Sequence, residues 1–236
     1  MFKDALAKQV ALRHCSDTGS ETGLIESFSQ VCRFLFDNPD RLSWRSKANI
    51  PSLVDETGLE RLAEKYFTSY RKSDFPAMPG TVPDEMVSIV IQEAYGYTVA
   101  ETERMKCEHQ HAMCAENCVG ALLERYLDSV LRHSGWSWCC GDFVKAVDFV
   151  RRDVADNWLA LQIKNRDNTE NSSSSAIRNG TPIQKWFRSF SRTGGTNWKN
   201  LPPLMQGYPL SEVGFVFFVR RYFELEKANI EQTVSK

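Results

Sequence analysis

The chain has 236 residues, of which 42% are hydrophobic, and its formal net charge is −1. This length allows one large domain with a full core, and the nearly neutral total excludes the strongly basic composition of many polyanion-binding proteins. No apolar run approaches the roughly 18 residues of a membrane span, and the charged N-terminus lacks the apolar segment of a secretory signal. Seven cysteines, an odd number, argue against a disulfide framework. We therefore expect a soluble, cytoplasmic protein with reduced thiols.

Three helices are predicted in the first third of the chain. Apolar residues recur at helical spacing in residues 1–13, 22–37 and 57–72. The connector over residues 72–84 contains Pro76, Pro79, Gly80 and Pro83, which favour irregular structure. We therefore expect a helical N-terminal part over residues 1–80 and a second part over residues 81–236, together forming one compact domain.

The second part is predicted to begin with helices and to continue with strands. Helices are expected over residues 83–95 and 101–133, the second with a break near residues 109–114. Strand candidates at residues 142–151 and 157–166 flank the polar turn 152–156. A short helix is expected over residues 182–192, and a third strand over residues 213–223. This order of elements indicates a mixed α/β (α+β) fold.

Charge is distributed unevenly along the chain. Residues 164–199 contain seven basic and two acidic residues, a net charge of +5, so the remainder carries −6. A local basic patch can bind phosphates even on an acidic protein. A solvated basic face would have the same composition, so charge alone leaves both interpretations open.

The two strand candidates place polar side chains at one end of a hairpin. If the hairpin is centred on residue 155, residues whose numbers add up to 310 face each other. Asp148 then lies opposite Gln162, and Ala146 opposite Lys164. Gln162 and Lys164 share a face because side chains alternate along a strand, and a one-residue shift of register would turn this face away. A carboxylate, an amide and an ammonium group would thus converge.

This set of side chains suits metal-assisted hydrolysis of a phosphodiester. Mg²⁺ prefers oxygen ligands, which Asp148, Gln162 and, from the helix over residues 101–133, Glu124 can offer. Lys164 beside the metal would orient the attacking water and stabilise charge on the phosphate. The alternative is a structural Asp–Lys pair at a strand end with Glu124 as an ordinary surface residue. Asp142 is the reserve candidate for the position of Asp148.

The arrangement resembles the PD-(D/E)xK nucleases, and a longer string is more specific. Residues 162–198, QIKNRDNTENSSSSAIRNGTPIQKWFRSFSRTGGTNW, are similar to the SinI/AvaII-type restriction endonucleases, which act at GGWCC, where W is A or T. The resemblance implies a PD-(D/E)xK core with a mixed sheet flanked by helices. It also implies Mg²⁺-dependent cleavage of double-stranded DNA to 5′-phosphate and 3′-hydroxyl ends.

The resemblance also implies roles for individual residues. Asp148, Gln162 and Lys164 take the catalytic positions, with Glu124 as a further candidate, and Asp148, Gln162 and Glu124 would be the metal ligands. Gln162 stands where most such nucleases carry an acid, which removes one negative charge from the metal site.

The polar tract over residues 165–198 would then contact DNA. Arg and Lys read guanine and Asn and Gln read adenine in the major groove, whereas phosphate contacts position the protein without specifying sequence. Candidates for DNA contact directly after the second strand are Asn165, Arg166, Asn168, Asn171, Ser172, Ser173, Arg178 and Asn179. Candidates for phosphate contacts on or next to the expected short helix are Lys185, Arg188 and Arg192.

The resemblance implies partners as well. They are double-stranded DNA and a cognate DNA methyltransferase in the bacterial cytoplasm, with no membrane. A recognition site that reads the same on both strands, apart from its central pair, is matched by a two-fold homodimer. The apolar stripe over residues 24–36 and the helix over residues 57–72 are candidate dimer surfaces, although either could serve the core.

Two other functions remain as alternatives at this point. One is a structure-specific DNA repair nuclease of the same fold. The other is a zinc-stabilised nucleic-acid-binding protein without hydrolysis, because zinc favours Cys and His in sets of four. The soft ligands available within twelve residues are Cys107, His109, His111, Cys114 and Cys118. Their spacing fits no common zinc finger, and buried thiols with surface histidines are the simpler interpretation.

Overall fold

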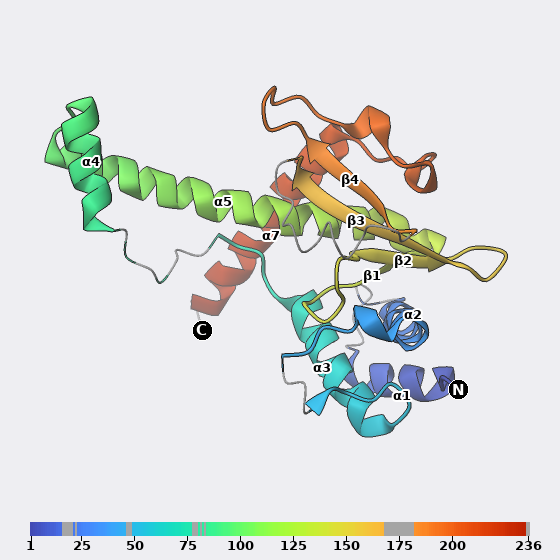
Figure 1. Cartoon of the computed structure of the whole chain (residues 1–236). Helices are drawn as coiled ribbons and strands as arrows, with labels where there is room; N and C mark the ends of the chain where they lie inside the picture. Colours follow the sequence, from blue (N-terminus) through green and yellow to red (C-terminus); the bar gives the residue numbers. More distant parts are fainter. Residues whose placement is uncertain are drawn as a thin grey trace. The chain divides into compact units, whose positions relative to one another are not determined.

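A computed structural model of the chain describes residues 1–15, 21, 23–45, 49–76, 80, 82, 84–167 and 182–234 (Figure 1). The helices in these ranges are α1 (Asp4–His14), α2 (Leu24–Asp37), α3 (Glu56–Arg71), α4 (Glu85–Tyr95), α5 (Val99–Leu131) and α7 (Glu212–Val234). The strands are β1 (Ser137–Trp138), β2 (Phe149–Arg152), β3 (Trp158–Arg166) and β4 (Gln184–Ser189). The mixed α/β class predicted from the sequence is confirmed.

The chain divides into two compact units. One consists of Met1–Lys72 and Glu124–Arg220 and contains the sheet with α1–α3, and the other consists of Ser73–Leu123 and Arg221–Lys236. The units do not follow the expected boundary at residue 80, because a later segment of the chain folds with the first 72 residues. The assignment of residues 81–236 to a nuclease core stays a prediction. None of the helices in the described part of the chain combines the length and apolar character that crossing a bilayer requires.

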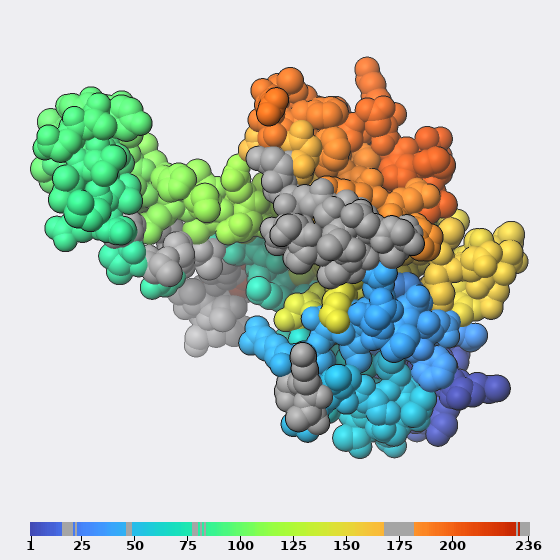
Figure 2. Space-filling view, viewed as in Figure 1, coloured from blue at the N-terminus to red at the C-terminus, as the bar shows by residue number. Residues whose placement is uncertain are grey.

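The core of the first unit lies between its helices and the sheet. The helical spacing of apolar residues in α2 and α3 buries Phe28, Val31, Leu62 and Tyr66 completely. The rings of Phe28 and Tyr66 meet edge to face at 5.5 Å. Helix α1 packs on α2 and α3, and α2 contacts β1 and β2. In Figure 2 the blue to cyan residues of the N-terminal part lie against yellow residues from the part of the chain that contains β1 and β2. The apolar stripes of α2 and α3 therefore serve the core, which is one of the two roles that the sequence left open for them.

The sheet confirms the predicted hairpin register. Its strands lie in the order β1-β2-β3-β4, with β4 parallel to β3 and the other neighbours antiparallel. Phe149 pairs with Leu161 and Arg152 with Trp158, so paired residue numbers add up to 310 as expected. The strand predicted over residues 142–151 is nevertheless too long, since β2 begins only at Phe149. Ala146 has a left-handed backbone, with φ of 57°, and this conformation interrupts the extended chain before Phe149.

Two predicted elements are of the wrong type, and one predicted break is absent. Residues 184–189 form a strand instead of a helix, because they pair in parallel with β3, a partner that local spacing does not reveal. Residues 213–223 begin helix α7 instead of forming a strand, since a continuous apolar run does not distinguish the two. The Ser211 hydroxyl accepts a hydrogen bond from the Gly214 amide at 3.1 Å and so caps the start of this helix. Helix α5 continues through residues 109–114.

Candidate active site

Asp148 lies directly before β2, and two hydrogen bonds of its main chain hold it in place. Its amide donates to the Leu161 carbonyl, and its carbonyl accepts from the Cys139 amide, both at 2.8 Å. Its side-chain Oδ2 accepts a hydrogen bond from the Ile163 amide at 2.6 Å. The carboxylate therefore occupies the place that a main-chain carbonyl would take if the β2–β3 ladder continued. This contact holds the carboxylate against β3 at the residue between Gln162 and Lys164.

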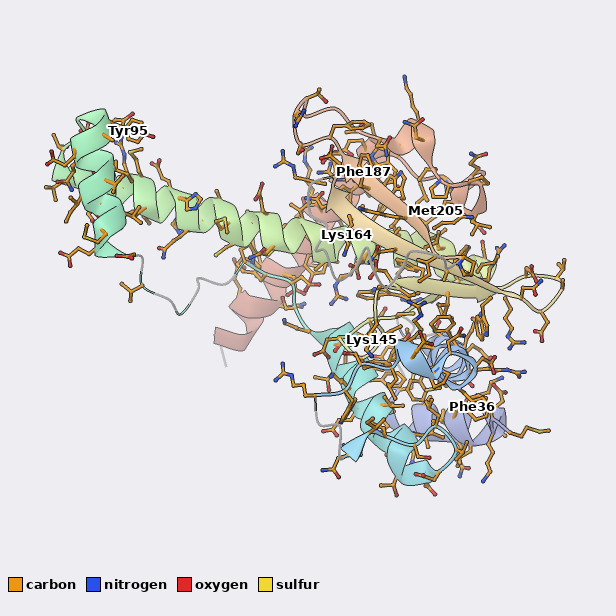
Figure 3. All side chains as sticks on the ribbon, viewed as in Figure 1. Phe36, Tyr95, Lys145, Lys164, Phe187 and Met205 are labelled. Atoms are coloured by element: carbon orange, nitrogen blue, oxygen red, sulfur yellow. The ribbon has the colours of Figure 1, made fainter. Side chains whose placement is uncertain are left out.

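Gln162 and Lys164 stand on the same face of β3, two residues apart. Gln162 is almost fully buried, with 1% of its surface exposed, and pairs in register with Lys185 of β4. Lys164 is half-buried and pairs in register with Phe187 of β4. Figure 3 labels both residues on these neighbouring strands. The ladder ends at the pair Phe149–Leu161, and Ala146 has a left-handed backbone. The expected pairings of Asp148 with Gln162 and of Ala146 with Lys164 are therefore not formed.

The electrostatics of Asp148 reflect its surroundings. Burial raises the pKa of the Asp148 carboxyl, and the Ile163 amide and the Lys164 ammonium lower it in part. Lys164 is thus close enough to act on Asp148 by charge, so the structure brings together the carboxylate and the ammonium that the sequence placed at one hairpin end. A carboxylate whose pKa is raised by burial and which lies beside a cation is typical of sites that hold a ligand.

Glu124 approaches the same region from α5. Its Oε2 accepts a hydrogen bond from Trp138 Nε1 at 2.9 Å, which ties the end of α5 to β1. Burial raises the pKa of the Cys139 thiol, and the nearby charge of Asp148 and, to a smaller extent, that of Glu124 raise it further. The two carboxylates therefore lie near one buried thiol. Sequence reasoning missed Cys139 and Trp138, and no local signal pointed to either.

The side-chain oxygen atoms of this region are suitable ligands for a hard cation. Two carboxylates, of Asp148 and Glu124, and the amide of the buried Gln162 offer the oxygen ligands that Mg²⁺ prefers. Within the described ranges no cluster of three or more His, Cys, Asp or Glu side chains could hold a metal ion. A metal here would accordingly depend on the Gln162 amide oxygen in addition to the two acids.

The zinc interpretation of the Cys and His residues in α5 is wrong. All five lie on one continuous helix, where Cys107 Sγ is 3.8 Å from His111 Nδ1. That pair lacks the further ligands of a zinc site, because the described residues gather no third Cys, His or acid there. The four-residue spacing of Cys114 and Cys118 reflects one turn of a helix rather than a metal-binding loop.

The reserve candidate Asp142 lies in a different environment. Its carboxylate pairs with Lys65 of α3 at 2.5 Å, and 61% of the side chain is exposed. The Lys65 ammonium lowers the pKa of the Asp142 carboxyl, the opposite direction to Asp148. Asp142 therefore belongs to the loop that faces α3, and Asp148 is the carboxylate held against β3.

The candidate DNA-contacting residues fall into two groups. Asn168, Asn171, Ser172, Ser173, Arg178 and Asn179 lie outside the described residues. Among the others, Arg188 of β4 donates to Asn165 Oδ1 at 2.9 Å and to Glu212 Oε1 at 2.6 Å, so these side chains bind each other. Arg166 donates to the Ser191 carbonyl at 3.1 Å, and Arg192 is exposed. Lys185 lies opposite Gln162 on β4.

The raised pKa of Asp148 predicts a gain in stability when its charge is removed. The folded state holds this proton more tightly than the unfolded state, so stability from this group is present below the ordinary pKa of 3.8 and is lost as pH rises through the raised value. In a metal chelator at neutral pH, Asp148→Asn should melt at a higher temperature than the natural protein. The difference should disappear below about pH 4.

Asp142→Asn is the matched control, because the pKa of that carboxyl is lowered and its neutralisation should not raise the melting temperature. Thermal unfolding followed by circular dichroism across pH measures both. An Asp148→Asn protein that melts no higher than the natural one would show that the carboxylate is not strained by burial.

Comparison with known proteins places the chain in a family. The family model described as SinI restriction endonuclease matches residues 7–225. Type II restriction enzyme Eco47I of Escherichia coli is 46% identical over 201 residues, which cover 84% of this chain and 87% of the relative. Type II restriction enzyme SinI of Salmonella infantis is 45% identical with the same coverage. The match spans both compact units and includes every residue of the candidate site, and the chain thus belongs to the SinI restriction endonuclease family.

Proposed function

We propose that this member of the family is a Mg²⁺-dependent type II restriction endonuclease that cleaves double-stranded DNA at GGWCC. The observation that carries the proposal is the 2.6 Å hydrogen bond from the Ile163 amide to Asp148, which sets a carboxylate beside Gln162 and Lys164. The relatives named type II restriction enzymes support the reaction class. The GGWCC specificity rests on the likeness of residues 162–198 to endonucleases that act at that site.

The metal would be held by Asp148, Glu124 and the amide oxygen of Gln162. A bound Mg²⁺ would supply electrostatic stabilisation of charge on the phosphate and would favour ionisation of water. Asp148 suits this position because its carboxylate is already oriented by the Ile163 amide, and burial strengthens its attraction to a cation. Gln162 would contribute a neutral oxygen, so the site has one negative charge fewer than a site with three acids.

Lys164 would act on the attacking water and on the phosphate. Its half-buried ammonium stands on the same face as Gln162 and close to Asp148. From there it can donate a hydrogen bond to a phosphate oxygen and orient a water molecule for in-line attack. The water oxygen forms the new bond to phosphorus, the bond to the 3′ oxygen breaks, and that oxygen takes up a proton. The products are a 5′-phosphate and a 3′-hydroxyl.

A plasmid digestion tests the proposal. Purified protein with Mg²⁺ should yield discrete fragments whose ends map to GGWCC. Lys164→Ala should reduce the cleavage rate by roughly 10²–10³-fold, the usual cost of losing one hydrogen-bond donor to the charge of the transition state, yet should still bind a duplex with that site. Smeared products, or cutting only at branched DNA, would contradict the proposal and would favour the structure-specific repair nuclease.

Substitutions at Gln162 test its role as an oxygen ligand. Gln162→Glu keeps an oxygen at this buried position and adds a negative charge, so it should retain some activity with an altered preference among divalent metals. Gln162→Ala removes the oxygen and should lose far more. Cleavage rates measured across a series of Mg²⁺ and Mn²⁺ concentrations give the comparison. Equal activity of the two variants would show that the Gln162 oxygen does not bind the metal.

The proposal includes a homodimer, with a DNA methyltransferase as functional partner in the bacterial cytoplasm. Each chain has one Asp148–Gln162–Lys164 set, whereas a double-strand break needs two phosphodiester bonds cut. A two-fold dimer places one set on each strand of a site that is symmetric apart from its central pair.

Sizing the protein with and without a cognate duplex tests the dimer. We expect a mass of twice the 27.0 kDa of one chain, together with conversion of supercoiled plasmid to linear DNA without much nicked circle. A 27.0 kDa species in both states, with nicked circles accumulating first, would indicate two sequential single-strand cuts instead.

A further inference from the structure

A second feature of the first compact unit has the chemistry of a phosphate site. A cavity of about 330 Å³ opens beside α3 and is lined by Trp44, Arg61, Glu64, Lys65, Thr68 and Ser69. The α3 residues recur at intervals of three or four, so they form one face of the helix. The volume lies near the lower end of the range for small-ligand sites. Two cations and two hydroxyl groups in one cavity provide the hydrogen-bond donors that an anionic oxygen needs.

Trp44 holds both cations in place. The Arg61 guanidinium lies 5.2 Å and the Lys65 ammonium 4.8 Å from the centre of the indole ring. Attraction between a cation and the face of an aromatic ring favours these positions. The two positive groups are therefore already gathered in the free protein, which lowers the entropic cost of binding an anion between them.

One of these cations, Lys65, already forms an ion pair with a carboxylate. Asp142 Oδ1 is 2.5 Å from Lys65 Nζ, although most of the Asp142 side chain is exposed to solvent. Arg45 is close enough to act on the Asp142 carboxyl as well. The immediate surroundings of the cavity thus contain three basic groups and two acidic ones, Glu64 and Asp142. The exposed pair is weak enough for another anion to replace the carboxylate.

The cavity is connected to the candidate active site by a short segment of chain. The Cys139 amide binds the Asp148 carbonyl at 2.8 Å, and Asp142 follows Cys139 by three residues. Three extended residues span at most about 11 Å. Gly141, with φ of 95°, keeps this segment close to α3, where a Cβ would come within 3.1 Å of Ser69 Oγ. One strand of B-DNA carries a phosphate every ~3.4 Å along the helix axis. The Cys139–Asp142 separation is therefore no more than about three such intervals, so one bound strand can reach both Asp148 and the cavity.

We propose that this cavity binds a backbone phosphate of the DNA, a few nucleotides from the bond that is cut, with Asp142 displaced from Lys65 by that phosphate. The inference rests on the proposed nuclease function and adds a contact that positions the duplex without reading its sequence. Asp142 keeps Lys65 paired until DNA arrives and competes with the phosphate for that ammonium group.

Variants of the ion pair should change DNA affinity in opposite directions. Lys65→Ala should weaken binding of a GGWCC duplex and of a scrambled duplex of the same length alike. It should also reduce the slope of log affinity against log salt by about one, as expected for one lost phosphate contact. Asp142→Asn should tighten binding to both duplexes, because it removes the competing anion. Fluorescence anisotropy in a metal chelator, at several salt concentrations, measures affinity without cleavage.

The chain offers a matched control in the ion pair of Lys8 and Glu26 at 2.8 Å, which lies on α1 and α2. Lys8 is exposed to a similar extent as Lys65, 35% against 29% of the side chain. Lys8→Ala and Glu26→Gln make the same changes of charge outside the cavity and should leave the salt slope unchanged. A difference in DNA affinity or salt slope between the Lys65 and Asp142 variants and the Lys8 and Glu26 variants therefore depends on where the charge lies and not on the total charge.

The outcomes separate this inference from the proposed function. If Lys65→Ala has the salt slope of Lys8→Ala while the natural protein cuts plasmid at GGWCC, the phosphate site is wrong and the nuclease stands. If the natural protein binds duplex DNA without cutting it and Lys65→Ala lowers the slope, the phosphate site stands and the nuclease fails. Weaker binding of Asp142→Asn would also overturn the inference, since it would mean that Asp142 supports the DNA contact.

Discussion

The geometry of the candidate active site depends on the hydrogen bond from the Ile163 amide to the Asp148 carboxylate. This bond joins the residue before β2 to the middle of β3 at 2.6 Å, where a regular ladder would have used a main-chain oxygen. Because Gln162 and Lys164 flank Ile163 in the sequence, the same contact sets both beside the carboxylate. The left-handed Ala146 two residues earlier ends the extended chain and lets Asp148 turn its side chain into this position.

This arrangement has a cost in stability. A carboxylate withdrawn from water disfavours its own charge, and the Lys164 ammonium and one amide offset that cost only in part. Such a cost is tolerated where a ligand supplies the missing charge, and a cation held by Asp148, Glu124 and Gln162 would do so. Trp138 contributes by fixing the Glu124 carboxylate at the end of α5, which brings a residue from a distant helix to the same region.

The polar residues around β4 combine structural and functional roles. Arg188 links the end of β3 to the start of α7 through Asn165 and Glu212, and it lies over the ring of Phe215 at 5.4 Å. The Trp198 indole donates to the other oxygen of Glu212 at 2.6 Å. A side chain with such partners is held in one position, so any DNA contact from Arg188 would require exchange of an internal partner. Arg192, by contrast, is exposed and lies in a turn.

The amino-acid sequence by itself determined the hairpin register, the helices α1–α4 and the proximity of Asp148 to Gln162 and Lys164. Alternation along a strand and helical spacing of apolar residues are local properties, so they can be read from neighbouring positions. Only the tertiary structure decided that residues 184–189 form a parallel strand, that Glu124 is tied to Trp138, and that Asp142 faces Lys65 across 77 positions of sequence. Each of these depends on a partner far along the chain, and local patterns carry no information about which distant residues will supply the hydrogen bond or the charge.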